Sequence, residues 1–413
     1  MSFVETLRCR GCAREYPVEP LNVCEFCFGP LEVSYDYDSM ARSVTRKKIE
    51  DGPYTMWRYH DFLPVNPDAV VDIGAGFTPL LRADNLAQAI GVEHLYIKND
   101  SVNPTFSFKD RPVSVTASKA VEFEFETLAC VSTGNLMGSV AGHGAKAGMR
   151  TVVFFPADLE KGKILSAAIY GPTLVAVGGT YDQANRLCSE LADDLGWAFV
   201  NINMRPFYAE GSKTLGYEVA EQLGWRAPDN CVVPAASGEL HTKIWKGLQE
   251  FEDVGLIDGV NTRMHLAQAA GCSPIVEAFD QGSDQVRPVK PNTIAKSLAI
   301  GDPAAGPFAL ETLKQTGGKA IATPEDEVVA GIRLLAETEG IFTETAGGVV
   351  ISGLKRLVER GDIKRDEVTV AYITGNGLKT QEAVEHVVDP VFIEPTYAAF
   401  EKAMEGMDGW RRP

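Results

Sequence analysis

The chain of 413 residues has no long apolar run, and positive charge is scarce in it. No stretch approaches the roughly 20 consecutive apolar residues that a membrane-spanning helix needs. The N-terminus lacks the apolar segment of a secretion signal, so we expect a cytoplasmic protein. Lys and Arg number 39 against 56 Asp and Glu, which gives a formal net charge of −17. Such a charge repels polyanions, and it disfavours nucleic acid and anionic membranes as partners.

Two nucleotide-binding motifs are missing as well. No G-x4-G-K-[ST] phosphate loop occurs, and Gly74-Ala75-Gly76 does not open a dinucleotide fingerprint, because Pro79 occupies the third glycine position. The apolar share of 45% is ordinary for a globular protein, and the length suffices for two or three domains. From about residue 54, apolar runs of strand length alternate with helical patterns. This alternation predicts an α/β fold with parallel sheets covered on both faces.

The predicted elements can be placed along the chain. We predict a strand and its exit at 33–38, and strands at 95–98, 127–132, 151–155, 174–177, 198–202, 231–233, 264–267 and 368–373. Helices are predicted at 41–52, 113–123, 137–147, 241–251 and 324–339. The last of these has Thr323 as its expected N-cap and Pro324 at its first helical position.

Eight cysteines fall into two groups. Cys9, Cys12, Cys24 and Cys27 form two C-x2-C pairs separated by eleven residues, a spacing typical of a four-thiolate zinc site. Four cysteines leave no open coordination position, so the zinc would be structural. An unmetallated remnant and a nucleic-acid-binding ribbon remain alternatives, although five glutamates offset the nearby arginines. The isolated cysteines are predicted to be small buried core residues: Cys130, Cys188, Cys231 and Cys272.

Four polar or glycine-containing segments each lie after a predicted strand: 107–111, 132–135, 234–240 and 373–379. The first contains Lys109, whose amine becomes a nucleophile if its surroundings lower its pKa. The second and third precede predicted helices, and backbone amides at a helix start bind anions. Taken singly, each segment could be a charged turn, a helix cap or a glycine turn. Their convergence points to one site.

The order and spacing of these segments resemble those of the fold-type II pyridoxal-phosphate (PLP) enzymes, with the threonine synthase branch as the best match. Segments 77–80, 210–214 and 339–342, together with the ribbon, extend the resemblance over nearly the whole chain. The resemblance implies that Lys109 holds PLP covalently and then serves as the base. It implies that Asn135 meets the phenolic oxygen of PLP and Thr374 its pyridine nitrogen. The PLP phosphate would lie on four backbone donors: Ala236, Ser237, Gly238 and Leu240.

The same resemblance suggests the residues that bind substrate. The substrate carboxylate would lie on Ser132, Thr133 and Gly134, and two hydroxyls near the lysine could also donate to substrate oxygens, those of Thr105 and Ser107. Arg205 is a candidate for a substrate phosphate, with Lys213 as a weaker one, because a guanidinium suits an oxyanion. A salt bridge with Glu210 or Glu218 is the alternative for these cations. Glu239 departs from the family pattern, since a carboxylate beside a phosphate is repulsive.

We therefore expect a PLP fold-type II α/β protein, similar to the β subunit of tryptophan synthase. The zinc ribbon would span 1–40, a large PLP-binding domain 41–112 and 196–413, and a small mobile domain 113–195. The expected function is that of a threonine synthase acting on O-phospho-L-homoserine, in a homodimer. Three alternatives stay open: β-replacement on O-phosphoserine as in cysteate synthase-like relatives, a specialised paralogue in secondary metabolism, and a ribbon-dependent nucleic-acid-binding or regulatory protein.

Overall fold

The computed structural model describes residues 3–159 and 161–405. The chain divides into two compact units, Met1–Thr380 and Gln381–Pro413. The second unit contains two short 3-10 turns and the helix α15 (Tyr397–Met404), whose start is capped by the Thr396 side chain accepting from the amide of Ala399. The large domain predicted at 41–112 and 196–413 includes this second unit. None of the described helices is long and apolar enough to cross a bilayer.

The N-terminal part of the first unit is a small antiparallel sheet in the order β2-β1-β3. Its strands are β1 (Val4–Cys9), β2 (Glu15–Tyr16) and β3 (Leu31–Tyr35). The strand and exit predicted at 33–38 contain the end of β3, after which the Asp36 side chain caps α1 (Tyr37–Ser43). The single helix predicted at 41–52 is two short ones, α1 and α2 (Arg46–Glu50).

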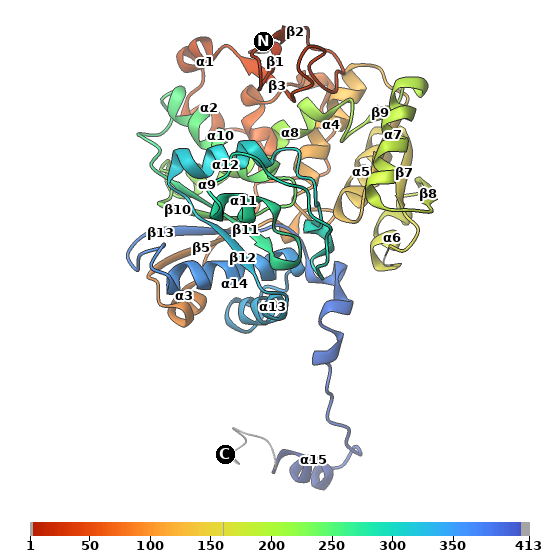
Figure 1. Cartoon of the computed structure of the whole chain (residues 1–413). Helices are drawn as coiled ribbons and strands as arrows, with labels where there is room; N and C mark the ends of the chain where they lie inside the picture. The colour runs from red at the N-terminus through yellow and green to blue at the C-terminus, as the bar shows by residue number, and fades with distance from the viewer. Residues whose placement is uncertain (1–2, 160, 406–413) are drawn as a thin grey trace. The chain divides into compact units, whose positions relative to one another are not determined.

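A six-stranded sheet forms the centre of the first unit, in the order β12-β11-β10-β13-β5-β4 (Figure 1). All its neighbours pair in parallel except β4 with β5. The strands are β4 (Leu80–Arg82), β5 (His94–Asn99), β10 (Asn230–Pro234), β11 (Arg263–Ala269), β12 (Ala320–Thr323) and β13 (Val368–Ile373). The short strands β4 and β12 were not predicted, because neither carries a long apolar run.

A second, four-stranded sheet has the order β8-β7-β6-β9 and is entirely parallel. Its strands are β6 (Thr127–Val131), β7 (Arg150–Pro156), β8 (Thr173–Val177) and β9 (Ala198–Phe199). Apolar runs of strand length predicted all four, although β8 is partly exposed and β9 ends three residues before the end of the strand predicted at 198–202. That residues 113–195 form a separate mobile domain stays a prediction.

Helices connect the strands and cover the sheets. The α-helices are α3 (Asp84–Ile90), α4 (Asp110–Glu122), α5 (Asn135–Ala147), α6 (Lys161–Ala168), α7 (Tyr181–Leu195), α8 (Arg205–Gly211), α9 (Thr214–Gln222), α10 (Glu239–Asp253), α11 (Pro274–Asp280), α12 (Gly306–Thr316), α13 (Glu325–Glu339) and α14 (Thr345–Glu359). The predicted start of the helix at 324 is wrong by one residue. Thr323 is the last residue of β12, and Pro324 is the N-cap.

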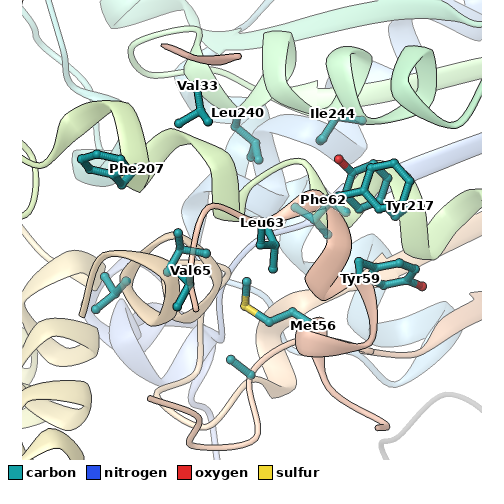
Figure 2. Close-up of a cluster of buried hydrophobic side chains, with 14 of the residues drawn as sticks. Val33, Met56, Tyr59, Phe62, Leu63, Val65, Phe207, Tyr217, Leu240 and Ile244 are labelled. Atoms are coloured by element: carbon teal, nitrogen blue, oxygen red, sulfur yellow. The ribbon is translucent and has the colours of Figure 1, made fainter. Parts of the chain in front are cut away.

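The ribbon sheet is joined to the body by a shared apolar core (Figure 2). Val33 of β3 belongs to the same cluster as Phe207 of α8 and Leu240 of α10. The rings of Phe62 and Tyr217 pack in this core with centroids 5.0 Å apart and their planes tilted by 46°. The four isolated cysteines are all buried, which confirms that prediction.

Candidate active site

Lys109 stands immediately before α4, in a loop held against the end of β13. The amide of Phe108 donates to the carbonyl of Thr374 at 2.9 Å, and the amide of Asn376 donates to the carbonyl of Phe106 at 3.1 Å. The Lys109 amine donates to the hydroxyl of Tyr208 at 2.8 Å. Burial lowers the pKa of Lys109 to about 8, against the opposing effect of nearby carboxylates. A lysine with this pKa is partly a free amine near neutral pH, as a nucleophile requires.

The segment 132–135 connects β6 to α5 and lines the same cavity as Lys109. The amide of Gly134 donates to the Ser132 hydroxyl at 3.0 Å, which folds the loop over the start of α5. Asn135 is the first residue of α5, and its side-chain nitrogen donates to both carboxylate oxygens of Glu344 at 2.9 Å. Its side-chain oxygen is buried and has no hydrogen-bond partner among the described residues. A buried acceptor left without a partner is typical of a ligand site.

The segment 235–240 leads from β10 into α10 and forms the opposite part of the cavity wall. Gly238 has φ +88, a left-handed conformation that glycine adopts without strain, and a Cβ there would lie 3.0 Å from the carbonyl of Ala305. The turn therefore exposes backbone amides at the start of a fifteen-residue helix, which is suited to a phosphate.

The structure brings ten of the predicted site residues to one cavity of about 150 Å³. They are Lys109, Ser132, Thr133, Gly134, Asn135, Ala236, Ser237, Gly238, Leu240 and Thr374. Thr374 lies directly after the last strand of the sheet and is buried. The residues come from four strand ends in two sheets, so the fold assembles a site that the chain leaves dispersed over 266 positions.

Glu344 and Tyr208 also line the cavity, and the sequence analysis did not identify them as site residues. Glu344 is almost fully buried, and burial raises the pKa of its carboxyl despite the two hydrogen bonds from Asn135. Tyr208 contacts the lysine amine, and burial raises the pKa of its phenol, which keeps the hydroxyl protonated. A signal for Tyr208 was available, because it follows Arg205 by one helical turn. The only sequence signal for Glu344 was the presence of an acidic residue in an otherwise apolar stretch.

Four predicted substrate residues are not brought to the cavity. Lys213 is fully buried in a separate network, where its ammonium lies 2.6 Å from Glu210 and 3.0 Å from Glu250. These carboxylates already neutralise Lys213, and the pair with Glu210 is the salt bridge considered as the alternative. A role of Lys213 at a substrate phosphate stays a prediction. The side chains of Thr105 and Ser107 form hydrogen bonds with neighbouring residues instead. The Thr105 hydroxyl donates to Asp110 at 2.5 Å, and the Ser107 hydroxyl accepts from the Lys109 amide at 3.3 Å.

Arg205 lies beside the cavity rather than in its wall. Its guanidinium is 3.7 Å from the carboxylate of Glu239, so the expected salt bridge exists but with a different partner from those considered. This pair explains how Glu239 is tolerated at the start of α10. The arginine draws the carboxylate towards α8 and offsets its repulsion of a phosphate.

The four ribbon cysteines meet at one point. Their sulfur atoms all lie within 4.8 Å of one another, with Cys9 and Cys27 at 3.4 Å and Cys12 and Cys24 at 3.6 Å. Tetrahedral zinc with bonds of about 2.3 Å places thiolates about 3.8 Å apart, so this set fits the ion. Gly29 is required by close packing, because a Cβ there would lie 3.0 Å from the Cys9 sulfur.

Comparison with known proteins agrees with this geometry. Residues 71–375 match a family model described as pyridoxal-phosphate dependent enzyme. The solved structure of diaminopropionate ammonia lyase from Escherichia coli superposes with a TM-score of 0.66 over 83% of this chain and 92% of that chain, at 18% identity. The structure of the processed form of threonine deaminase isoform 2 from Solanum lycopersicum superposes with a TM-score of 0.63 over 75% of this chain and 83% of that chain, at 23% identity. The fold is therefore that of a fold-type II PLP enzyme.

Two curated relatives narrow the family further. The threonine synthase of Methanocaldococcus jannaschii is 39% identical over 94% of this chain and 96% of its own length. The threonine synthase of Methanosarcina acetivorans is 36% identical over 97% of this chain and 98% of its own length. The chain belongs to the threonine synthase family of the PLP-dependent enzymes.

Proposed function

We propose that the protein is a threonine synthase, which converts O-phospho-L-homoserine and water to L-threonine and phosphate. The observation that carries the proposal is the position of the Lys109 amine. It lies in the wall of a cavity that is also lined by the anion-binding loops 132–135 and 236–240 and by Thr374. The relatives that match the chain over almost its whole length support the same activity.

The residues of the cavity fit PLP. We infer that Lys109 attaches it covalently, that Asn135 offers its unsatisfied side chain to the phenolic oxygen, and that Thr374 meets the ring nitrogen. The amides of segment 236–240 would hold the phosphate at the start of α10. Bound there, PLP supplies an electron sink that stabilises the charge left when a proton is removed from the substrate Cα.

The residues around the substrate can then carry the reaction. The backbone amides and hydroxyls of segment 132–134 bind the α-carboxylate. The amine of Lys109, with a pKa of about 8, accepts the Cα proton and later returns it. A proton also leaves Cβ, the Cγ–O bond breaks, and phosphate departs. Hydroxide from water then joins Cβ, and a proton joins Cγ to give the methyl group of threonine.

Tyr208 has a positioning role in this scheme. Its hydroxyl accepts from the Lys109 amine at 2.8 Å, which fixes the direction in which the amine points. Because burial keeps the phenol protonated, it orients the lysine without competing as a base.

Further properties of the protein follow as proposals. Structural zinc in the four-cysteine cluster is supported by the sulfur positions. A small mobile domain over 113–195 is supported by the separate four-stranded sheet. A homodimer and a cytoplasmic location accord with a biosynthetic enzyme that uses a small phosphorylated amino acid.

The test is phosphate release by the purified holoenzyme from O-phospho-L-homoserine and from O-phospho-L-serine, with the amino-acid product identified in each case. We expect L-threonine from the first substrate. If phosphohomoserine yields no threonine while phosphoserine with sulfite yields product, the proposed activity is wrong and a β-replacement takes its place.

A further inference from the structure

The ribbon sheet packs behind the helix that carries Tyr208 to the lysine. α8 lies against α4 and also against β3 of the ribbon. Tyr208 and Glu210 are two residues apart on α8, so their side chains leave the helix on nearly opposite faces. Tyr208 reaches the Lys109 amine, whereas Glu210 is fully buried and its carboxylate accepts from the hydroxyl of Tyr35 in β3 at 2.8 Å. The ribbon therefore contacts the back of a helix whose front contributes to the site.

A buried network of charges joins α8 to the ribbon and to α10. Three carboxylates and three ammonium groups form it: Glu32, Glu210, Glu250, Lys213, Lys243 and Lys246. Lys243 of α10 connects the two sides, since its ammonium lies 3.1 Å from Glu32 of β3 and 3.1 Å from Glu210 of α8. Burial acts to raise the pKa of Glu210, but the three lysines outweigh burial and lower it to about 2. Arg10 adds a further cation at the exposed edge, 3.9 Å from Glu32.

The same network holds the helix that begins at the cavity. α10 follows directly after the segment 236–238, and it carries Lys243, Lys246 and Glu250. The hydroxyl of Tyr37, which follows the ribbon sheet, donates to Glu250 at 2.7 Å. Leu240 lines the cavity and belongs to the same apolar core as the ribbon strand β3 (Figure 2). The N-terminal part of the chain is thus attached to two helices that supply cavity residues.

Apolar packing alone could attach the ribbon, so the buried charges need a separate explanation. Withdrawal of charged groups from water costs about as much as their pairing returns, so a buried ionic network adds little stability. It does restrict geometry, because each carboxylate oxygen accepts only from donors in suitable directions. One oxygen of Glu210 accepts from Tyr35 and lies 2.6 Å from the Lys213 ammonium, and the other accepts from Lys243 at 3.1 Å. Rotation of α8 would break these contacts.

We propose that the ribbon positions the active-site lysine, with Glu210 as the positioning residue through which it acts. Tyr35 and Lys243 fix the carboxylate of Glu210. This carboxylate fixes the rotation of α8, and that rotation sets where the Tyr208 hydroxyl meets the Lys109 amine. The inference rests on the positioning role of Tyr208 within the proposed function and adds the residues that hold Tyr208 in place. A metal in the four-cysteine cluster would then serve the site at a distance, by keeping β3 folded.

The test measures how fast the full-length protein, freed of cofactor, attaches added PLP, followed by the rise in visible absorbance. The ribbon variant is Tyr35→Phe, which removes one hydroxyl and leaves every charge of the network in place. The direct variant is Tyr208→Phe, and a third protein carries both changes. The matched control is Tyr59→Phe, because that buried hydroxyl also donates to a buried glutamate, Glu221 of α9. The zinc content and melting temperature of each protein are recorded.

We expect Tyr208→Phe to slow attachment about threefold to tenfold, as for the loss of one hydrogen bond. Tyr35→Phe should slow it at least about twofold with its zinc content unchanged. Because residues of one network are not additive, the double variant should be less than about twofold slower than Tyr208→Phe alone. Tyr59→Phe should be destabilised to a similar extent as Tyr35→Phe, yet attach PLP at the wild-type rate.

Three results overturn the proposal: slowing of less than about twofold in Tyr35→Phe or Tyr208→Phe, equal slowing in Tyr59→Phe, or effects that multiply in the double variant. If Tyr35→Phe does not fold, Glu32→Gln replaces it at a partly exposed position, and the same limits apply. Because attachment of PLP needs no turnover, these results are separable from a failure of the proposed function. A protein that makes no threonine but shows the non-additive pair retains the positioning role and loses the assigned reaction.

Discussion

Glu218 is the residue whose replacement most directly tests how the start of α4 is held in place. Its carboxylate is fully buried and lies 2.6 Å from the ammonium of Lys98. It also accepts from the guanidinium of Arg111, two residues after the catalytic lysine, at 2.8 Å, and from the amide of Phe77 at 2.6 Å. We predict that Glu218→Gln destabilises the protein and weakens retention of PLP, because Lys98 is left buried without a carboxylate.

The magnitude follows from the pKa of Glu218. Burial acts to raise it, but Arg111 and Lys98 outweigh burial and lower it from 4.5 to about 2. At about 1.36 kcal/mol per pKa unit, the charged form contributes about 3 kcal/mol to folding. Removal of one partner from a buried ion pair costs about 3–5 kcal/mol, which agrees. For a chain of this length, that loss corresponds to a fall in melting temperature of about 4 °C.

The assay is thermal unfolding followed by circular dichroism, with Glu359→Gln as the control. Glu359 forms an exposed ion pair with Lys355 at 3.8 Å, so its loss should change the free energy of unfolding by less than about 0.5 kcal/mol. The pH dependence gives a second measure. Because the folded pKa of Glu218 is depressed, its contribution is complete above about pH 4.5 and is lost as the pH falls towards 2. A melting temperature within about 1 °C of the wild type at pH 7 would refute this reasoning.

Three further predictions concern the lysine and the cysteines. Lys109→Ala should prevent borohydride from fixing a pyridoxyl group to the chain and should abolish threonine formation, and retained activity would count against its role. In cofactor-free protein, modification of Lys109 by an amine reagent, followed by mass spectrometry, should rise with pH around a midpoint near 8, because burial favours the neutral amine; a midpoint near 10.5 would contradict this. Elemental analysis should find one zinc per chain, and Cys12→Ser should lose it and unfold at lower temperature. The substitution Ser189→Ala, at a partly exposed position of α7, provides the control for the last experiment, and full zinc content in Cys12→Ser would argue against a four-thiolate site.

Local patterns along the chain were sufficient to predict much of the architecture. The apolar runs predicted β5, β6, β7, β8, β10, β11 and β13. Parallel strands covered on both faces are mostly apolar, and all of these except the edge strand β8 are largely buried. The cysteine spacing predicted a four-sulfur cluster, since a metal knuckle is a local structure. The weakly apolar strands β4 and β12 were not predictable in this way. Their pairing is decided by the neighbouring strands β5 and β11 rather than by their own residues.

The sequence alone determined which groups could form the site. It contains a lysine and several segments that each follow a strand, two of which lead directly into a helix. Only the tertiary structure decided which charged residues reach the cavity. Lys213 and Arg205 looked suited to a substrate oxyanion. However, Lys213 pairs with Glu210, one helical turn away, and with Glu250 of α10, and Arg205 pairs with Glu239 of α10. Glu344 carried no clear signal, but folding brings it into the cavity wall beside Asn135. The physical reason is that a side chain's charge acts over a few ångströms in space, and this proximity is set by packing between elements far apart in sequence.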